Sequence, residues 1–431
     1  MRRRDLRAYP QGRNQGDRGH PVLQRRRLGG EPDRIGGNHG RRSAHRALEQ
    51  NPASSRAGQK TGVSARSARK HRFAAGDCNV RICIVTDAWS PQVNGVVKTL
   101  EHTIAELKNT GHDVLVIEPS EFLSLPCPGY AEIRLSLFSS AKLSRKIDAF
   151  RPDALHVATE GPLGLSARRF ALKRGLNFTS AYHTKFPEYL QARTGVPARM
   201  FYPLMHWFHR PSKAVMVSTD TVIRELHGHG FQRLVKWSRG VDLALFNDGD
   251  TAEASRADKD IPIFLYVGRI AVEKNIEAFL RLELPGEKWL VGSGPAMPEL
   301  ADKYPDAVFL GAKTHAELAV IYRQASVFVF PSKTDTFGLV LLEALASGLP
   351  VAAFPVAGPI DVLQGCEAAA LRHDLHEACL SALELNPRQA REHALKFTWQ
   401  KTTHQFASNL YPNGNPPRTT ALEMPAKTSS G

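Results

Sequence analysis

The sequence contains few cysteines and no long apolar run. Its 431 residues include five cysteines, an odd number, and no two of them have Cys-x-x-Cys spacing. This argues against a disulfide framework or a zinc ribbon and is typical of a reducing cytoplasm. No apolar segment approaches the roughly 20 residues that a transmembrane helix needs. The N-terminal arginines are not followed by the apolar stretch of a secretory signal. We therefore expect a cytoplasmic protein.

Acidic residues are scarce only in the first part of the chain. The whole sequence has 57 Lys and Arg against 42 Asp and Glu, a net charge of +15. Residues 1–76 hold 19 of these bases and 5 of these acids, a net charge of +14, so residues 77–431 carry only +1. A nearly neutral body argues against the alternative of a basic nucleic-acid-binding protein, which would need cations on its folded part.

Residues 1–76 are also poor in apolar side chains and rich in Arg, Gly and Ser. Such a segment cannot bury enough surface to offset the entropy of ordering it, so we predict a disordered basic extension. Two origins for it stay open. It is either a native arm for an anionic partner, or a stretch added by translation from a start upstream of the native one, near Val80.

Strands and helices are expected to alternate from residue 80 onward. Apolar runs typical of buried strands lie at 82–86, 113–118, 153–158, 178–183 and 214–218. A second series lies at 262–268, 288–291, 308–310, 327–330 and 351–354. Helical patterns separate these runs, for example at 96–108 and 273–282. This alternation predicts an α/β fold with two Rossmann-like parallel-sheet domains that face each other across a cleft.

The domain boundaries follow from the polar stretch 247–260, which separates the two series. After the extension 1–76, we place the first domain at 77–250 and the second at 261–395. A helical segment at 396–412 is expected to cross back to the first domain, and 413–431 is expected to form a tail.

Chemically distinctive residues follow the strands, where ligands bind in open parallel sheets. After the first strand, Asn94 and Gly95 open a helix whose N–H groups suit a phosphate, although Asn94 can equally be a plain helix cap. After the first strand of the second series come Gly268, Arg269 and Lys274. Two cations near a helix N-terminus suit a diphosphate; the alternative is a pair of solvated surface charges.

The segment 331–344 is the richest in such residues. Asp335 lies in the predicted loop before a helix, and Glu343 lies about two turns into that helix. Carboxylates at these places can accept hydrogen bonds from pairs of sugar hydroxyls. Gly338 leaves room for a ligand beside the backbone. The neighbours of Glu343 are nearly all apolar, which argues against a merely solvated acid.

Two more candidates follow strands of the first series. His183 ends a strand and can bond a sugar hydroxyl or a phosphate, or serve as a buried structural histidine. Glu160 lies in a strand-to-helix loop and is a candidate acceptor contact. Residues 199–213 interleave aromatic and basic side chains, which suits an anionic membrane surface or, alternatively, a buried helix with basic ends.

These motifs together resemble those of family 4 retaining nucleotide-sugar glycosyltransferases, which have the GT-B fold. The resemblance spans about residues 80–410. The family's acidic motif, two glutamates separated by seven residues, is present with Asp335 in place of the first glutamate and with Glu343 as the second. The shorter side chain leaves open which hydroxyl of the donor sugar it holds. The Gly-Arg-(four)-Lys pattern at 268–274 matches in full.

Two shorter segments strengthen the resemblance. Residues 292–295 are similar to the family's Gly-x-Gly-Pro, and 240–242 to its Gly-Val-Asp, with Arg239 where many members have asparagine. The segments 87–96, 182–184 and 334–340 are similar to GDP-mannose-dependent alpha-mannosyltransferases and also to sulfoquinovosyl- and glucosyl-diacylglycerol synthases. The sequence does not separate these two subgroups.

The resemblance implies a retaining glycosyltransferase that moves a hexose, with mannose favoured, from a nucleoside diphosphate sugar to a lipid or glycan hydroxyl. A UDP-sugar-dependent diacylglycerol glycolipid synthase stays open, as does a sugar-nucleotide epimerase or phosphorylase on the same fold. Peripheral contact with the cell membrane is compatible with a lipid acceptor, and no nucleic-acid partner is expected.

The resemblance also assigns roles to residues. The implied catalytic residues are His183, Arg269, Lys274 and Asp335. The implied donor-binding residues are Gly95, Gly268, Gly294, Phe337, Gly338, Leu339 and Glu343. Glu160 and Tyr182 are the candidate acceptor contacts. No Asp-x-Asp motif marks a metal site, so we expect no metal and no cofactor apart from the sugar nucleotide as co-substrate.

Overall fold

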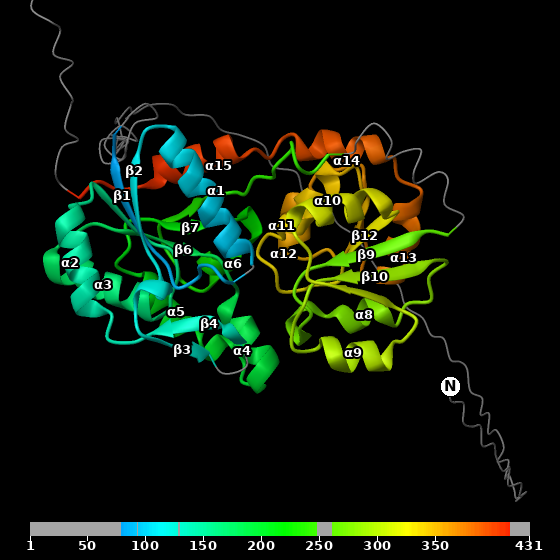
Figure 1. Ribbon diagram of the computed structural model, residues 1–431, viewed down its shortest axis with the longest axis horizontal. Coiled ribbons are helices and arrows are strands. Elements are labelled where there is room, and N and C mark those ends of the chain that lie inside the picture. Colours follow the sequence, from blue (N-terminus) through cyan, green and yellow to red (C-terminus); the bar gives the residue numbers. More distant parts are fainter. Residues whose placement is uncertain (1–78, 93, 128–129, 248–260, 414–431) are drawn as a thin grey trace, which may run out of the picture. The chain divides into compact units, whose positions relative to one another are not determined.

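The computed structural model describes residues 79–92, 94–127, 130–247 and 261–413. The predicted extension 1–76, most of the predicted linker and residues 414–431 lie outside these ranges. Within them, two six-stranded parallel sheets confirm the predicted α/β class (Figure 1).

The first sheet has the strand order β2-β1-β5-β6-β7-β8. Its strands are β1 (Arg81–Val85), β2 (Asp113–Ile117), β5 (Ala154–Val157), β6 (Thr179–Tyr182), β7 (Val215–Val217) and β8 (Leu234–Lys236). Its helices are α1 (Gly95–Asn109), α2 (Ser140–Phe150), α3 (Pro162–Arg174), α4 (Phe186–Thr194), α5 (Tyr202–His209) and α6 (Asp220–Gly228). Alternate residues of β1 enter different core clusters, Ile82 and Ile84 on one face and Cys83 and Val85 on the other. Both faces are therefore covered, which explains the continuous apolar runs.

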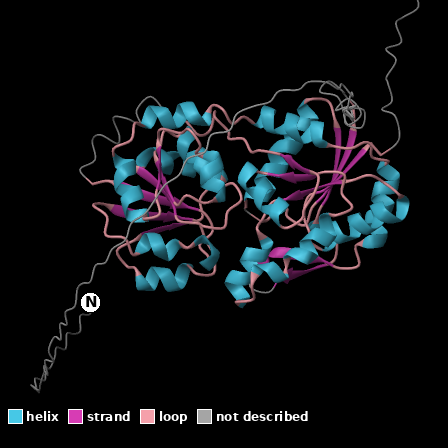
Figure 2. Cartoon of the chain, turned by 180° about the vertical axis from the view of Figure 1, so that it is seen from behind, coloured by secondary structure: helices cyan, strands magenta, loops and turns pink. Residues whose placement is uncertain are grey.

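The second sheet has the order β11-β10-β9-β12-β13-β14. Its strands are β9 (Ile263–Val267), β10 (Glu287–Val291), β11 (Val308–Gly311), β12 (Val327–Phe330), β13 (Val351–Ala353) and β14 (Ala369–Leu371). Its helices are α8 (Ile276–Leu280), α9 (Met297–Lys303), α10 (His315–Gln324), α11 (Leu339–Ala346), α12 (Ala357–Val362), α13 (Leu375–Leu383) and α14 (Pro387–Ala394). Helices flank both sheets (Figure 2). The strand order reverses between β9 and β12, which is where such sheets bind ligands.

The structure differs from the sequence expectation in several places. The last strand of each sheet, β8 and β14, was not predicted. An unpredicted antiparallel hairpin joins β3 (Ser124–Cys127) to β4 (Tyr130–Ser136). The helix predicted at 273–282 is instead a single 3-10 turn, η4 (Val272–Lys274), followed by α8. Asn275 separates the two because its backbone is left-handed, with φ 54°. Its side-chain amide donates to the Pro331 carbonyl at 3.0 Å, which ties this segment to the end of β12.

The last helix, α15 (Trp399–Asn409), packs against α1 of the first domain (Figure 1). Phe406 is fully buried in the same cluster as Ile82 and Trp237. The Gln405 side chain also accepts a hydrogen bond from the Ser238 amide at 2.9 Å. The end of the described chain therefore completes the core with which it begins.

None of the helices in the described ranges has the length and apolar character needed to cross a membrane.

Candidate active site

An ion pair stands where the strand order of the second sheet reverses. Lys274 follows β9, Asp335 follows β12, and these strands are neighbours. The Lys274 Nζ lies 2.5 Å from Asp335 Oδ1, and both side chains are largely buried. Burial alone would lower the pKa of Lys274, but the Asp335 carboxylate and Tyr189 raise it above its ordinary value. The ammonium is therefore charged at neutral pH.

Only one of the two carboxylate oxygens of Asp335 is hydrogen-bonded to a described residue. Its Oδ1 accepts from Lys274, whereas its Oδ2 is buried with no hydrogen-bond partner among the described residues. A buried acceptor without a partner costs about 1–3 kcal/mol. A ligand hydroxyl that donates to this oxygen would remove that cost.

The helix after Asp335 has an open N-terminus. Gly338 precedes α11 with φ 85°, and no side chain caps the helix. By contrast, Asn94 caps α1 and accepts from the amides of Val96 and Val97, which supports the simple-cap alternative for that position. An uncapped helix start favours an anion. Of these two helix starts, α11 retains the freer amides.

The starts of these two helices approach each other. A Cβ added to Gly95 would lie 3.5 Å from the Leu339 side chain. Phe337 is buried in the core of the second domain. The structure thus brings Gly95, Leu339 and the Asp335 loop to one region.

The glycines after β9 and β10 allow close main-chain packing. A Cβ at Gly292 would lie 1.9 Å from the Gly268 carbonyl oxygen, and a Cβ at Gly294 would lie 2.2 Å from that of Ile270. These contacts would exclude any side chain. They explain the glycines at 292 and 294 by packing between two strand ends. At Gly268, φ is 152° and an added Cβ would lie 2.9 Å from the Tyr266 hydroxyl. The donor contacts implied for Gly268 and Gly294 stay predictions.

Glu343 lies on α11 and accepts a hydrogen bond from the Tyr322 hydroxyl at 3.0 Å. Burial raises the pKa of this carboxyl to about 7, and the Tyr322 hydrogen bond only partly opposes the shift. Glu343 is half-buried, as its apolar neighbours indicated by arguing against a solvated acid. Its Tyr322 partner, 21 residues earlier, was not predicted.

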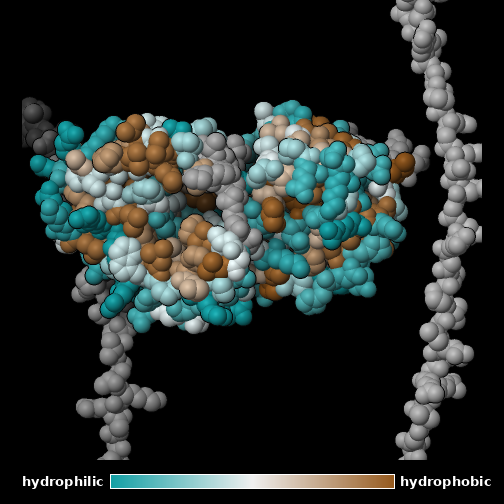
Figure 3. Space-filling view, turned by 90° about the horizontal axis from the view of Figure 1, so that it is seen from below, coloured by the Kyte–Doolittle hydropathy of each residue, from teal (hydrophilic) through white to brown (hydrophobic). Residues whose placement is uncertain are grey.

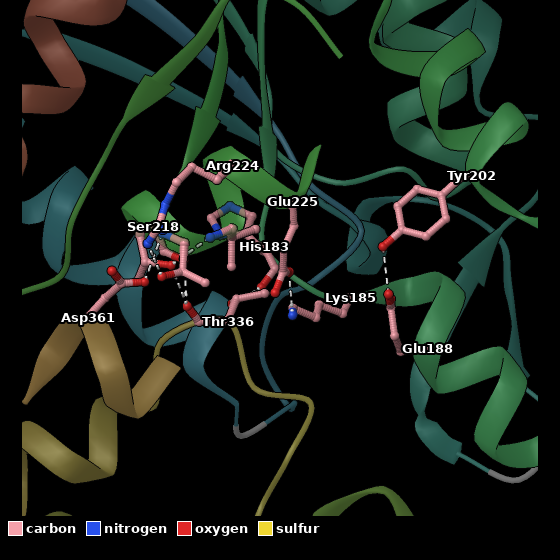
Figure 4. A network of polar contacts seen from close by, with 12 residues as sticks. His183, Lys185, Glu188, Tyr202, Ser218, Arg224, Glu225, Thr336 and Asp361 are labelled. Atoms are coloured by element: carbon pink, nitrogen blue, oxygen red, sulfur yellow. Dashed lines mark hydrogen bonds and ion pairs between the residues drawn. The ribbon is translucent and has the colours of Figure 1, made fainter. Parts of the chain in front are cut away.

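His183 follows β6 and is bonded on two sides. Its ring Nδ1 lies 2.9 Å from a guanidinium nitrogen of Arg239, and its carbonyl accepts from the Thr336 hydroxyl at 2.7 Å. Figure 4 shows His183 and Thr336 in one polar network that also includes Ser218 and Asp361. Ser218 donates to the Thr336 carbonyl at 3.0 Å. These bonds hold the segment around Thr336, which follows β12 of the second sheet, against the strand ends of the first sheet.

The two candidate acceptor residues have structural partners. Glu160 lies 3.2 Å from Nε2 of the buried His209. Tyr182 is 1% exposed and belongs to a core cluster with Tyr202 and Met205. Its position favours support of the neighbouring His183 over direct contact with an acceptor.

Arg269 follows β9, and its main-chain carbonyl accepts a hydrogen bond from the Tyr266 hydroxyl at 2.8 Å. Among the described residues, no group of three or more His, Cys, Asp or Glu side chains is arranged to hold a metal ion.

Two glycosyltransferase family models match this chain. Residues 93–245 match the family described as Glycosyltransferase Family 4, and residues 261–384 match Glycosyl transferases group 1. A GDP-mannose-dependent alpha-mannosyltransferase of Mycobacterium tuberculosis is 32% identical over 66% of this chain and 82% of its own length. Sulfoquinovosyl transferase SQD2 of Arabidopsis thaliana is 28% identical over 74% of this chain and 71% of its own.

Solved structures share the fold. Sucrose-phosphate synthase from Thermosynechococcus elongatus has a TM-score of 0.60 at 21% identity, covering 76% of this chain and 97% of that one. The Anabaena protein HepE in complex with UDP and glucose has a TM-score of 0.57 at 13% identity, covering 76% and 98%. These likenesses confirm the predicted two-domain GT-B architecture.

The raised pKa of Glu343 leads to a stability prediction. Because this carboxyl binds a proton more readily in the folded chain than in the unfolded chain, wild-type stability falls as the pH rises through about 7. Glu343→Gln removes that loss. We expect the free energy of unfolding of E343Q to gain about 2 kcal/mol on wild type between about pH 5 and pH 8.5, measured by urea unfolding.

Glu317→Gln is the matched control. Hydrogen bonds from Thr314 lower the pKa of the exposed Glu317, so it is ionised in both states over this range. Its difference from wild type should stay constant with pH. A constant difference for E343Q as well would contradict the buried carboxyl.

Proposed function

The chain belongs to glycosyltransferase family 4, and on this premise we propose that it is a retaining hexosyltransferase. It moves a hexose, with mannose favoured, from a nucleoside diphosphate sugar to a hydroxyl of a lipid or glycan. The observation that carries this proposal is the Lys274–Asp335 ion pair, which lies at the strand reversal and is followed by an uncapped helix. A bound diphosphate can replace Asp335 as the partner of the Lys274 ammonium. The Asp335 carboxylate can then accept a hydrogen bond from a sugar hydroxyl.

The proposed chemistry concerns a departing diphosphate. The bond between the anomeric carbon and the diphosphate breaks, and the acceptor oxygen bonds that carbon on the same face. The leaving diphosphate takes the acceptor's proton. Lys274, Arg269 and the amides at the start of α11, beside Gly338, stabilise the negative charge that develops on the leaving group.

The sugar and the nucleotide are held by separate groups in this proposal. Asp335 accepts from a hydroxyl of the hexose, while His183 binds the sugar or the diphosphate. Glu343, as a carboxylate, accepts from the ribose hydroxyls. Mannose is favoured because relatives from Mycobacterium tuberculosis and Corynebacterium glutamicum are named GDP-mannose-dependent. The name of the sulfoquinovosyl transferase supports the alternative of a glycolipid synthase that uses a UDP-sugar.

A panel of donors tests this assignment. We expect GDP-mannose to raise the unfolding temperature more than UDP-glucose, UDP-galactose or UDP-sulfoquinovose, since specific binding stabilises the folded state. A larger shift with a UDP-sugar would support the glycolipid synthase instead. No shift with any donor, together with no transfer, would contradict the transferase proposal. Consumption of a labelled donor without an acceptor would favour the epimerase.

Lys274→Ala tests the diphosphate contact within the same panel. We expect at least a tenfold loss of turnover and a smaller thermal shift with the preferred donor, while circular dichroism stays unchanged. Lys303→Ala is the control because Lys303 pairs with Glu277 on the surface. Near-normal turnover in K274A would rule out the clamp.

A lipid acceptor is favoured over a soluble glycan by the surface of the first domain. Brown apolar patches gather on the face shown in Figure 3. In the chain around α5, Met200 is 65% exposed, Leu204 53% and Trp207 50%. The Arg168 guanidinium lies 3.9 Å from the Trp207 ring. Apolar side chains with neighbouring cations suit an anionic membrane surface, where the chain would act as a peripheral protein.

The opposite face of α5 is buried, with Tyr202, Met205 and Phe208 in the core. The buried-helix alternative for residues 199–213 therefore holds for one face of α5. The membrane alternative rests on the other face, which exposes Leu204 and Trp207.

Vesicle co-sedimentation tests the membrane contact. In about 0.5 M salt, which screens the basic extension, we expect Leu204→Ser with Trp207→Ser to weaken binding to phosphatidylglycerol vesicles about tenfold. Leu395→Ser, at an equally exposed leucine of the second domain, should bind like wild type. Equal binding by all three proteins would contradict contact through α5.

A further inference from the structure

Arg239 is a buried cation that has no acidic partner among the described residues. It is 5% exposed, and its guanidinium donates to the Trp237 carbonyl at 2.5 Å and the Ser238 carbonyl at 2.9 Å. Its remaining hydrogen bond is with His183 Nδ1. No carboxylate in the described ranges forms an ion pair with it. Burial lowers the pKa of Arg239 to about 9, so the guanidinium is still charged at neutral pH.

A charge buried without a counterion is costly unless hydrogen bonds satisfy it. Two neutral carbonyls satisfy part of the guanidinium, and the Trp237 ring lies 4.7 Å from its central carbon. The His183 ring packs edge-on against the same Trp237, with centroids 5.4 Å apart. Trp237 thus forms a common support that holds the two side chains side by side.

The chemistry of Arg239 determines where His183 carries its hydrogen. A guanidinium has five N–H donors and no acceptor, so Nδ1 of His183 has to accept. A neutral imidazole that accepts at Nδ1 carries its hydrogen on Nε2. That Nε2 is buried and has no partner among the described residues. The His183 side chain therefore holds an unused hydrogen-bond donor, while its main-chain carbonyl accepts from Thr336, the neighbour of Asp335.

The surroundings of His183 also keep its ring neutral. Burial lowers its pKa well below the ordinary value, and Arg239, His156 and His209 lower it further. Trp237 contributes no charge, and Thr336 bonds only the main-chain carbonyl. No acid faces the ring in the described structure to oppose these effects.

We propose that Arg239 is a positioning residue that fixes His183 as a neutral, Nε2-protonated hydrogen-bond donor to the sugar nucleotide. His183 then donates to an oxygen of the sugar or the diphosphate and does not act as a base. The identity of that ligand rests on the proposed function. An asparagine at position 239 could present either its oxygen or its amide to Nδ1, whereas arginine can only donate. Arginine in place of asparagine at position 239 therefore restricts Nδ1 of His183 to the role of acceptor.

Nitrogen NMR of the full-length protein tests the tautomer without any measurement of activity. The His183 signal is identified by its loss in His183→Gln. We expect an unprotonated Nδ1 and a protonated Nε2 throughout pH 5.5–8.5. Protonation at Nδ1 in the wild-type protein would overturn the proposal.

Arg239→Met and Arg239→Lys test whether Arg239 determines the tautomer of His183. Methionine removes the charge and the donor, so we expect His183 to become a mixture of tautomers or to titrate within this pH range. Lysine also has donors only and should retain the Nε2 tautomer. His393, whose Nε2 bonds the Val362 carbonyl, is the internal reference and should not change. An unaltered His183 signal in R239M would overturn the proposal.

Two isosteric variants test the role of His183 in transfer. Glutamine can place an amide N–H near the position of Nε2, and asparagine near that of Nδ1. We expect H183Q to retain at least tenfold more activity than H183N with the preferred donor. Equal activities, or a more active H183N, would contradict donation from Nε2. If the wild-type protein transfers no sugar at all, the proposed function fails, whereas the NMR result still decides the tautomer.

Discussion

The candidate site depends on the hydrogen bonds of Thr336. Its hydroxyl donates to the His183 carbonyl, and its own carbonyl accepts from Ser218. Thr336 is buried and stands directly between Asp335 and Phe337, so these bonds fix the acidic motif of the second sheet relative to the end of β6 in the first. Asp361 adds a further link by accepting from the Thr221 amide at 3.0 Å. These bonds place residues from the ends of both sheets beside one another.

The charges at the site suit an anionic ligand. Lys274 and Asp335 neutralise each other, while Arg239 brings a positive charge that no acid in the described ranges pairs with. The start of α11 adds a partial positive charge without a capping side chain. Groups fixed in this way need little reorganisation when a negative charge develops, which is how enzymes stabilise a leaving diphosphate.

The sequence predicted ten of the twelve strands of the two parallel sheets, and the residues that follow them, because buried parallel strands are continuous apolar runs. It missed β8 and β14, which have only three residues each. It placed Lys274 and Asp335 after strands, and the topology made those strands neighbours. It did not predict the break at Asn275, since a left-handed backbone there depends on a bond to Pro331. Nor did it predict that Arg239 meets His183, 56 residues earlier, or that Thr336 bonds the His183 carbonyl. Such pairings arise from tertiary structure and leave no local pattern.

A crystal structure with a bound donor analogue would reveal whether Lys274 exchanges partners when the donor binds. We expect the Lys274 ammonium to move from Asp335 to the diphosphate, and Asp335 Oδ2 to accept a hydrogen bond from a hydroxyl of the sugar. An intact Lys274–Asp335 pair in a complex whose diphosphate lies elsewhere would contradict this exchange.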